Sequence, residues 1–374
     1  MRKLKNVLLL GRKELWSLAR DPMMLLLIVY VFSVSIYTSA TAQPETLNNA
    51  PIAIVDQDQS PLSARISSAF YPPEFIHPRM IEYGEMDSGM DTGEFTFVLN
   101  IPPGFQRDVL AGRSPEVQLN IDATRMSQAF TGNNYIQQVV MGEVNEFVRR
   151  YRSVDTLPVD LALRVRFNPT LEKAWFGSIA EVINSVAMLS IILTGAALIR
   201  EREHGTIEHL LVMPVTPGEI MASKVTAMGL VVLVATAASL NFVVRGLLGV
   251  PIEGSIPLFL CGAVLCLFAM TSMGIYLATL SRSMPQFGLL LMLTLLPMNL
   301  LSGGRTPRES MPEIVQNLMQ LAPTTHFVSL GQAILFRGAG IETVWQPFLA
   351  LLVIGTALFL LSLRRFRNTI SQMA

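Results

Sequence analysis

Six long apolar stretches constrain the fold of this 374-residue chain more than any other feature of its sequence. A helix needs about 20 mostly apolar residues to cross the hydrocarbon core of a bilayer, and each stretch is about that long. The sequence therefore predicts an α-helical polytopic membrane protein with six transmembrane helices. The stretches lie at about residues 23–41, 179–199, 222–244, 257–281, 286–303 and 345–363.

Composition supports this class. The chain is 51% hydrophobic and 15% charged, with a mean hydropathy of +0.45, which is typical of membrane proteins. The alternative is a large soluble protein with six buried core helices, and so many long uncharged runs weigh against it. For the first stretch the alternative is a cleavable signal peptide, because Ala40-Thr41-Ala42 has the A-x-A form. The long charged region before that stretch favours a helix that is retained.

Basic residues are distributed unevenly around the six stretches. If the N-terminus is cytoplasmic, 13 lysines and arginines lie on the cytoplasmic side, against four in the short outer loops. Basic residues in short flanking segments mark the cytoplasmic side of a membrane protein. We therefore predict cytoplasmic N- and C-termini, with a large domain outside. The four outer residues are Arg245, Arg305, Arg308 and Arg337.

Residues 42–178 are polar enough to form a soluble domain between the first two spans. Strands are expected at residues 52–55, 95–101 and 117–121, and helices from Ser60 to about Phe70, at 104–111 and at about 127–152. Strands that alternate with helices predict a small mixed α/β domain. Asp56 and Asp58 resemble part of a calcium loop, but proline and serine occupy the positions where an EF-hand needs glycine and glutamate. We therefore interpret this segment as a capped strand-to-helix turn.

The segment REREHGTIEHLLVMPVTPGEI, residues 200–220, is short, charged and strongly patterned. Its first half suits a helix with an apolar stripe, and Pro214 ends that helix because proline disfavours the α conformation before it. Thr216 and Glu219 then form a capping box around Pro217, which starts a new helix. A helix, a break and a capped restart between two spans predict a docking surface.

Residues 1–19 form an amphipathic helix, with one apolar face and five basic residues on the rest of its surface. This pattern is typical of a helix that lies in the membrane interface. A turn at Arg20, Asp21 and Pro22 separates it from the first span. The apolar face consists of Leu4, Val7, Leu8, Gly11, Leu15 and Leu18.

Residues 304–344 contain two half-apolar segments. Met311 and Pro312 begin the first, and Pro323, three residues before His326, interrupts the stretch. Two short helices with a proline break suit a re-entrant hairpin that enters from the outer face, because irregular backbone at membrane depth needs protein or water around it. The alternative is a pair of helices lying flat on the membrane.

Catalytic patterns are missing from the sequence. It has no phosphate-binding G-x-x-x-x-G-K-[ST] loop, its four histidines are scattered, and no nucleophile elbow occurs. The centres of the spans carry no charged residue, whereas an ion-coupled transporter usually needs one there. The two cysteines, Cys261 and Cys266, are interpreted as packing residues. We predict that the chain is not an enzyme and that any transport is powered from elsewhere.

Three segments together resemble ABC-2 type transporter permeases, in particular those of the bacterial inner membrane. The first runs from Lys13-Glu14-Leu15 to Arg20-Asp21-Pro22, and the second covers Arg200 to Lys224. The third runs from Leu301-Ser302-Gly303-Gly304 through Met311-Pro312 to His326-Phe327. The layout is similar over essentially the full length, and the pattern E-x-x-x-G-T-x-E-x-L-L-x-x-P in the second segment is the most specific part.

The resemblance implies a subunit that forms a path with a second permease, either a copy or a paralogue. Separate ATPase subunits would bind ATP and Mg, so this chain would hold no cofactor, and nucleic acid is not an expected partner. The cytoplasmic loop resembles a coupling helix that contacts the ATPase, and the N-terminal helix an elbow beside it. The residues implied in the ATPase contact are Glu203, Gly205, Thr206, Glu208, Leu210, Leu211 and Pro214.

The resemblance also implies export of a hydrophobic or amphipathic compound across the inner membrane of a bacterium. A periplasmic domain would bind either the substrate or a membrane-fusion adaptor. Two other classes stay open: a module that only transmits force to periplasmic partners, and a membrane sensor. The expected layout is an elbow at 1–21, spans at 22–41, 179–199, 222–303 (three spans) and 345–363, a periplasmic domain at 42–178, a coupling loop at 200–221, a periplasmic hairpin at 304–344 and a cytoplasmic tail at 364–374.

Overall fold

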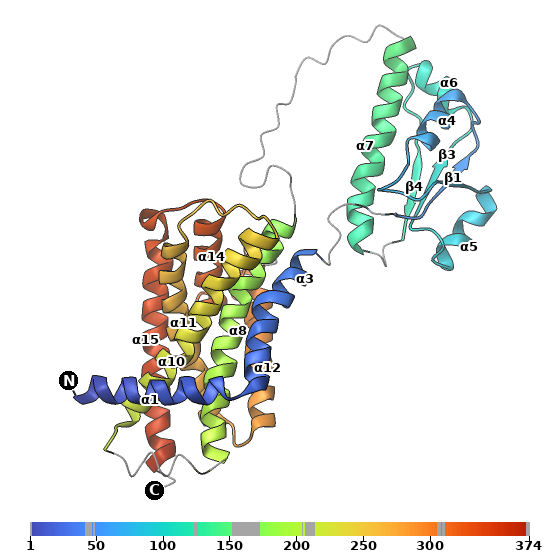
Figure 1. The fold of residues 1–374 in the computed structure, drawn as a ribbon. Helices are drawn as coiled ribbons and strands as arrows, with labels where there is room; N and C mark the ends of the chain where they lie inside the picture. The colour runs from blue at the N-terminus through green and yellow to red at the C-terminus, as the bar shows by residue number, and fades with distance from the viewer. Residues whose placement is uncertain are drawn as a thin grey trace. The chain divides into compact units, whose positions relative to one another are not determined.

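Helices dominate the computed structural model of the chain (Figure 1). It describes residues 2–41, 47, 49–122, 126–151, 173–203, 205, 214–304, 308 and 311–371. The chain divides into two compact units. A helical unit comprises Met1–Gln43 and Val165–Ala374, and an inserted unit comprises Pro44–Arg164.

The helical unit contains six helices that are long and apolar enough to cross a membrane, as the sequence predicted. Several extend beyond the expected ends, because a helix continues through charged residues that terminate an apolar run. Its elements are α1 (Arg2–Ala19), α2 (Pro22–Val29), the π-helical η1 (Tyr30–Ser35), α3 (Ile36–Thr41), α8 (Lys173–Glu203), α10 (Pro217–Ala238), the π-helical η3 (Ser239–Leu247), α11 (Ile256–Leu280), α12 (Met284–Leu301), α13 (Glu313–Met319), α14 (Pro323–Leu335) and α15 (Ile341–Ser371).

Helix α8 is the core of this unit. Within the most apolar part of the helix, 83% of its residues are buried, against 17% for α12 and α15. Its contact with α11 is close at Gly274, where an added Cβ would lie 2.8 Å from the Ile191 carbonyl oxygen. The hydroxyl of Thr194 donates to the Ser190 carbonyl oxygen one turn earlier, so this polar side chain is satisfied within the apolar helix.

Helix α1 crosses the long helices at the end where α8 terminates (Figure 1). Its predicted apolar face is divided between two environments. Gly11 and Leu18 are buried against the bundle, whereas Leu4 and Leu8 are 67% and 65% exposed. An amphipathic helix in the membrane interface places such exposed leucines in the lipid.

The segment after α12 forms the two predicted short helices, α13 and α14. Residues 320–322 separate them. Helix α14 is almost entirely buried and packs against α8, α11 and α15. Helix α13 exposes the apolar side chains of Ile314 and Leu318. The re-entrant hairpin stays a prediction, and the burial of α14 favours it over two helices lying flat on the membrane.

The inserted unit is a small mixed α/β fold, in the order that the sequence predicted. Its four-stranded sheet has the order β2-β1-β3-β4, in which β1 pairs in parallel with both neighbours and β4 is antiparallel to β3. The sequence did not predict β2 and α5, because residues 71–94 lack regular apolar periodicity. The elements are β1 (Ile52–Asp56), α4 (Pro61–Ser68), β2 (Arg79–Met80), the 3₁₀ helix η2 (Tyr83–Glu85), α5 (Met86–Asp91), β3 (Phe97–Ile101), α6 (Phe105–Leu110), β4 (Gln118–Ile121) and α7 (Met126–Tyr151).

The turn after β1 has the capped geometry expected from its sequence. The Asp56 carboxylate accepts the backbone N–H groups of Asp58 and Gln59 at 3.0 and 2.9 Å. Asp58 accepts the N–H of Gln106 at the start of α6. Burial alone would raise the pKa of Asp58, but hydrogen bonds from Ser60 and from the α6 backbone outweigh it, and the pKa is lowered. These carboxylates therefore hold a strand-to-helix turn together.

Candidate functional site

The predicted docking segment lies between the end of α8 and the start of α10. The structure describes Glu203, Gly205 and Pro214 of the seven predicted contact residues. Thr206, Glu208, Leu210 and Leu211 lie outside the described residues, so their contact role stays a prediction. The described part of the site is the frame from which this segment leaves the helical unit and to which it returns.

Helix α8 ends with two features that determine where the segment begins. Gly205 has φ +67°, a left-handed conformation that glycine adopts readily at a helix end. Its N–H donates to the Arg202 carbonyl oxygen at 3.1 Å. The carboxylate of Glu203 accepts the N–H of Met284, the first residue of α12, at 3.1 Å. Glu203 therefore joins the end of α8 to the start of α12.

The segment ends at the predicted capping box, which is confirmed. The Thr216 N–H donates to a Glu219 carboxylate oxygen at 2.6 Å, and the Thr216 hydroxyl oxygen accepts the Glu219 N–H. The other oxygen of Glu219 accepts a hydrogen bond from the side chain of Asn6 at 3.3 Å. The cap of α10 is thereby also bound to α1.

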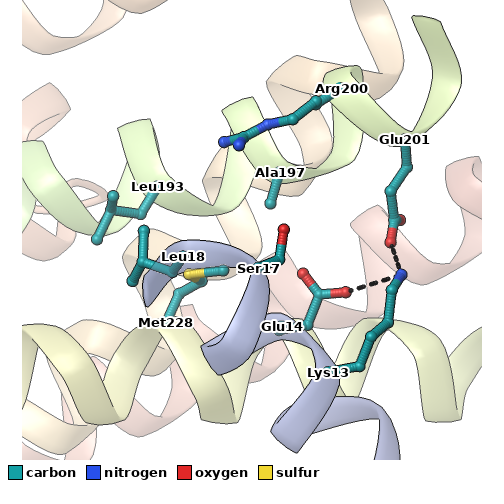
Figure 2. Close-up of a pocket in the computed structure, with 9 residues that line it drawn as sticks. All are labelled: Lys13, Glu14, Ser17, Leu18, Leu193, Ala197, Arg200, Glu201 and Met228. Atoms are coloured by element: carbon teal, nitrogen blue, oxygen red, sulfur yellow. Dashed lines mark hydrogen bonds and ion pairs between the residues drawn. The ribbon is translucent and has the colours of Figure 1, made fainter. Parts of the chain in front are cut away.

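Four charged side chains, Lys13, Glu14, Glu201 and Lys224, form a cluster where α1, α8 and α10 meet. The Lys224 ammonium lies 3.0 Å from Glu14 and 2.7 Å from Glu201. Lys13 binds the same two carboxylates, as the dashed lines in Figure 2 show. The Lys224 side chain is only 1% exposed. We call these four residues the charged cluster.

Charge balance explains how the cluster tolerates burial. Two ammonium groups face two carboxylates, and a buried charge is costly unless it is paired and hydrogen-bonded. Burial raises the pKa of Glu14, and the neighbouring carboxylate of Glu201 adds to the rise, while Lys224 and Lys13 oppose it. Burial acts to lower the pKa of Lys13, but its hydrogen bond to Glu201 and the nearby negative charges raise it. The cluster thus fixes α1 to the bases of two spanning helices.

The predicted turn at Arg20, Asp21 and Pro22 also connects α1 to α8. One carboxylate oxygen of Asp21 accepts the Met24 N–H at 3.2 Å and caps α2, in which Pro22 is the first residue. The other oxygen accepts a hydrogen bond from Arg200 on α8 at 2.6 Å. The guanidinium of Arg20 lies over the ring of Trp16. The turn therefore connects the elbow, the first span and α8.

The four residues predicted in the hairpin region lie elsewhere, on and before α13 and α14. Pro312 precedes α13 as its N-cap, with Met311 buried before it, and Pro323 is the first residue of α14. The His326 ring nitrogen is 2.8 Å from the Gln320 carbonyl oxygen, across the break between the helices. In Figure 1, α14 lies toward the end of the bundle opposite α1. The structure does not bring these residues to the docking frame.

Sequence reasoning did not predict the charged cluster. Two signals in the sequence point to it in retrospect. Glu14 is the single acidic residue of α1, and Lys224 stands in a helix whose next 20 residues carry no charge. An isolated charge in such surroundings needs a partner. The partner cannot be identified from local spacing, because Glu14 and Lys224 are 210 positions apart.

Metal chemistry has no candidate in the part of the chain that the structure describes, since no group of three or more His, Cys, Asp or Glu side chains is placed to hold an ion there. The charged cluster contains no nucleophile beside a base. Its chemistry is ionic cross-linking of helices, and what the arrangement provides is a stiff frame around an intervening segment.

Comparison with known proteins gives consistent matches. Residues 23–364 match the family model described as ABC-2 family transporter protein. The chain is 62% identical over 374 residues to the inner membrane transport permease YhhJ of Escherichia coli (strain K12), which covers 100% of both chains. It is 28% identical over 349 residues to the probable multidrug ABC transporter permease YbhR of the same organism, covering 92% of this chain and 93% of that one.

Proposed function

Because this chain belongs to the ABC-2 family of transporter permeases, we propose that it is the membrane subunit of an ATP-driven exporter in the inner membrane of a bacterium. It forms the translocation path together with a second permease subunit, either a copy of itself or a paralogue. Separate ATPase subunits hold ATP and Mg, and the energy of hydrolysis reaches this chain by contact.

The observation that carries the proposal is the frame around residues 204–213. At one side, Glu203 joins α8 to α12, and at the other, Glu219 joins the start of α10 to Asn6 of α1. The charged cluster connects α8, α10 and α1 across the frame. A force applied to the intervening segment is therefore transmitted to α8, the most buried helix of the unit, instead of being absorbed by a flexible connection.

The proposed contact with the ATPase uses the predicted residues of this segment. Glu203, Gly205 and Pro214 shape its two ends, while Thr206, Glu208, Leu210 and Leu211 supply the surface that meets the ATPase. This arrangement requires the segment, the N-terminus and the C-terminus to be cytoplasmic, with the inserted unit in the periplasm. The excess of basic residues in the segments assigned to the cytoplasmic side supports that orientation.

The proposed substrate is a hydrophobic or amphipathic compound. The spans offer mainly apolar side chains, and the name of the relative YbhR describes a probable multidrug permease. The inserted unit would meet either this substrate or a membrane-fusion adaptor. The re-entrant hairpin of α13 and α14 would line the exit of the path, consistent with the burial of α14 beside α8.

The decisive experiment purifies the tagged full chain with its partner from native membranes and measures ATP hydrolysis. We expect Glu208→Lys to lower the co-purified activity by at least about tenfold, the effect of losing about 1.4 kcal/mol of contact energy. Glu208 is the preferred position, because Glu203 also binds the Met284 N–H and its substitution would disturb α12.

A matched control reverses the same charge elsewhere. Glu116→Lys changes an exposed glutamate of the inserted unit, and we expect it to retain the wild-type ATP hydrolysis. The proposal is wrong if the wild-type preparation hydrolyses no ATP, or if Glu208→Lys and Glu116→Lys behave alike. ATP hydrolysis without export of any hydrophobic compound from reconstituted vesicles would refute the export function while retaining the ATPase contact.

A further inference from the structure

A cavity of about 260 Å³ lies beside the charged cluster, between α1, α8 and α10 (Figure 2). Its lining is divided into two halves. The apolar side chains of Leu18, Leu193 and Met228 gather at one side, while Lys13, Glu14 and Glu201 lie at the other, with Ser17 between them. A cavity with one apolar and one ionic half fits an amphiphile better than a purely polar or purely apolar molecule.

The charged groups that are most exposed in the lining of this cavity are hydrogen-bond donors. The side chains of Glu14 and Glu201 are only 7% and 11% exposed, and Lys224 and Lys13 together balance their two negative charges. The side chain of Lys13 is 47% exposed and that of Arg200 is 31% exposed. Arg200 uses one nitrogen to bind Asp21, and a guanidinium has further donors to offer. The accessible rim therefore presents the donors of Lys13 and Arg200, which suit an anionic headgroup.

The location determines which anion has access. Helix α1 carries basic residues and exposes Leu4 and Leu8 as an interfacial helix does. Basic pockets at this depth bind anionic lipid headgroups. A free phosphate ion would leave the apolar half of the cavity exposed to water, whereas a phospholipid covers it with the start of an acyl chain.

The volume is consistent with a headgroup and not with a whole lipid. If each heavy atom of a ligand takes up about as much space as one water molecule, about 30 Å³, then 260 Å³ holds a phosphate, part of a glycerol and the first methylenes of a chain. The rest of the lipid would extend past the exposed Ser17 into the surrounding bilayer.

We propose that this cavity binds the headgroup of an anionic phospholipid, which would hold the elbow helix α1 against α8 and α10. Lys13 and Arg200 contact the phosphate, and Leu18, Leu193 and Met228 contact the proximal acyl chain. The lipid is a structural ligand and not the exported compound. This inference does not depend on ATP-driven export, because the site is complete within the chain.

The test is native mass spectrometry of the full-length chain in detergent, with added phosphatidylglycerol or phosphatidylcholine of identical acyl chains. We expect one tightly retained phosphatidylglycerol, with a preference of about tenfold or more over phosphatidylcholine because two cations face the phosphate. Inorganic phosphate at equal concentration should not displace it. Equal retention of the two lipids, or displacement by phosphate alone, would overturn the proposal.

Two exposed positions on α1 provide a matched pair of variants. Ser17→Glu places a negative charge in the cavity, and Arg12→Gln lowers the net charge by the same amount at a position that does not line it. We expect Ser17→Glu to lose the preference for phosphatidylglycerol and Arg12→Gln to keep it. Equal effects in the two variants would show that only the overall charge of α1 matters, and the site would be refuted.

A third variant, Ala197→Phe, fills the cavity from α8 without changing any charge. We expect it to lose the retained phosphatidylglycerol while unfolding at a temperature close to that of the wild type. Retention of the lipid in a folded Ala197→Phe protein contradicts the proposal. If this variant does not fold, the surface pair Ser17→Glu and Arg12→Gln decides the question.

Discussion

Helix α8 carries Glu181 toward one end and Glu201 toward the other, and these two side chains are held in different ways. Glu201 lies in the charged cluster, 2.7 Å from Lys224 and also paired with Lys13. Glu181 accepts one hydrogen bond, from the Ser35 hydroxyl at 3.0 Å. Among the described residues, no lysine, arginine or histidine lies within ion-pair distance of Glu181. Twenty residues of helix separate Glu181 from Glu201, a distance of about 30 Å, which is roughly the thickness of the hydrocarbon core.

The two ends of the core helix are therefore held to their neighbours by different numbers of polar contacts. The end beside the docking frame is cross-linked by ions to α1 and α10 and by Glu203 to α12. At the other end, a single hydrogen bond from the Ser35 hydroxyl to the Glu181 carboxylate connects α8 to η1, one of two π-helical segments that pack against it. Such π-helical segments are frequently found at functional sites. A stiff end suits the reception of force, and a less constrained end suits movement.

The largest expected effect comes from removing the central cation. Lys224→Met leaves Glu14 and Glu201 buried with only Lys13 between them, and breaking a buried ion pair costs about 3–5 kcal/mol. We expect a lower midpoint in thermal unfolding of the full chain in detergent, and partial recovery when Glu14→Gln is added. Lys3→Met, which removes an exposed lysine of α1, is the control. Equal unfolding of the two methionine variants would show that the cluster does not stabilise the contact of α1 with α8 and α10.

A smaller effect is expected when one carboxylate of the cluster becomes neutral. Glu201→Gln keeps the shape of the side chain but weakens its hydrogen bonds to Lys224 and Lys13. Hydrogen bonds to charged groups contribute about 1.5–3 kcal/mol, so the loss should lie in that range. Denaturant unfolding in mixed micelles measures it. No change in stability would mean that Glu14 alone satisfies both lysines.

The left-handed conformation of Gly205 at the helix end should contribute about 1–2 kcal/mol to stability. Gly205→Ala forces a residue with a Cβ into φ +67°, which costs about 1–2 kcal/mol, although no atom of the described residues lies within 4 Å to clash with it. Gly288→Ala, inside α12 and also without close neighbours, should be neutral or slightly stabilising, because alanine favours helix over glycine. If the two variants change stability alike, the left-handed conformation is not what ends α8.

The smallest effect is expected at the other end of α8. In Glu181→Gln the amide oxygen still accepts the Ser35 hydroxyl, so the change in unfolding free energy should stay below about 0.5 kcal/mol. Comparison with Glu201→Gln under the same conditions tests the two ends directly. A loss at Glu181 as large as at Glu201 would refute the contrast between a stiff and a less constrained end.

Features that depend on local patterns were predictable. The capping box at Thr216 and Glu219, the turn at Asp21 and Pro22, and the strand-to-helix turn at Asp56 each depend on residues within a few positions of one another. The two helices around Pro323 follow from a proline break. The short strand β2 was not predicted, because two residues paired with β1 leave no periodic signal.

Length and composition by themselves determined that six helices are apolar enough to span a membrane, because an apolar run of about 20 residues has few other stable environments. Local spacing determined where α10 starts. Only the tertiary structure decided which charges meet, since Lys13 and Glu14 reach Glu201 and Lys224 through the packing of helices far apart in the chain. The physical reason is that a buried ion pair depends on distances in space, and spacing along the sequence does not encode those distances.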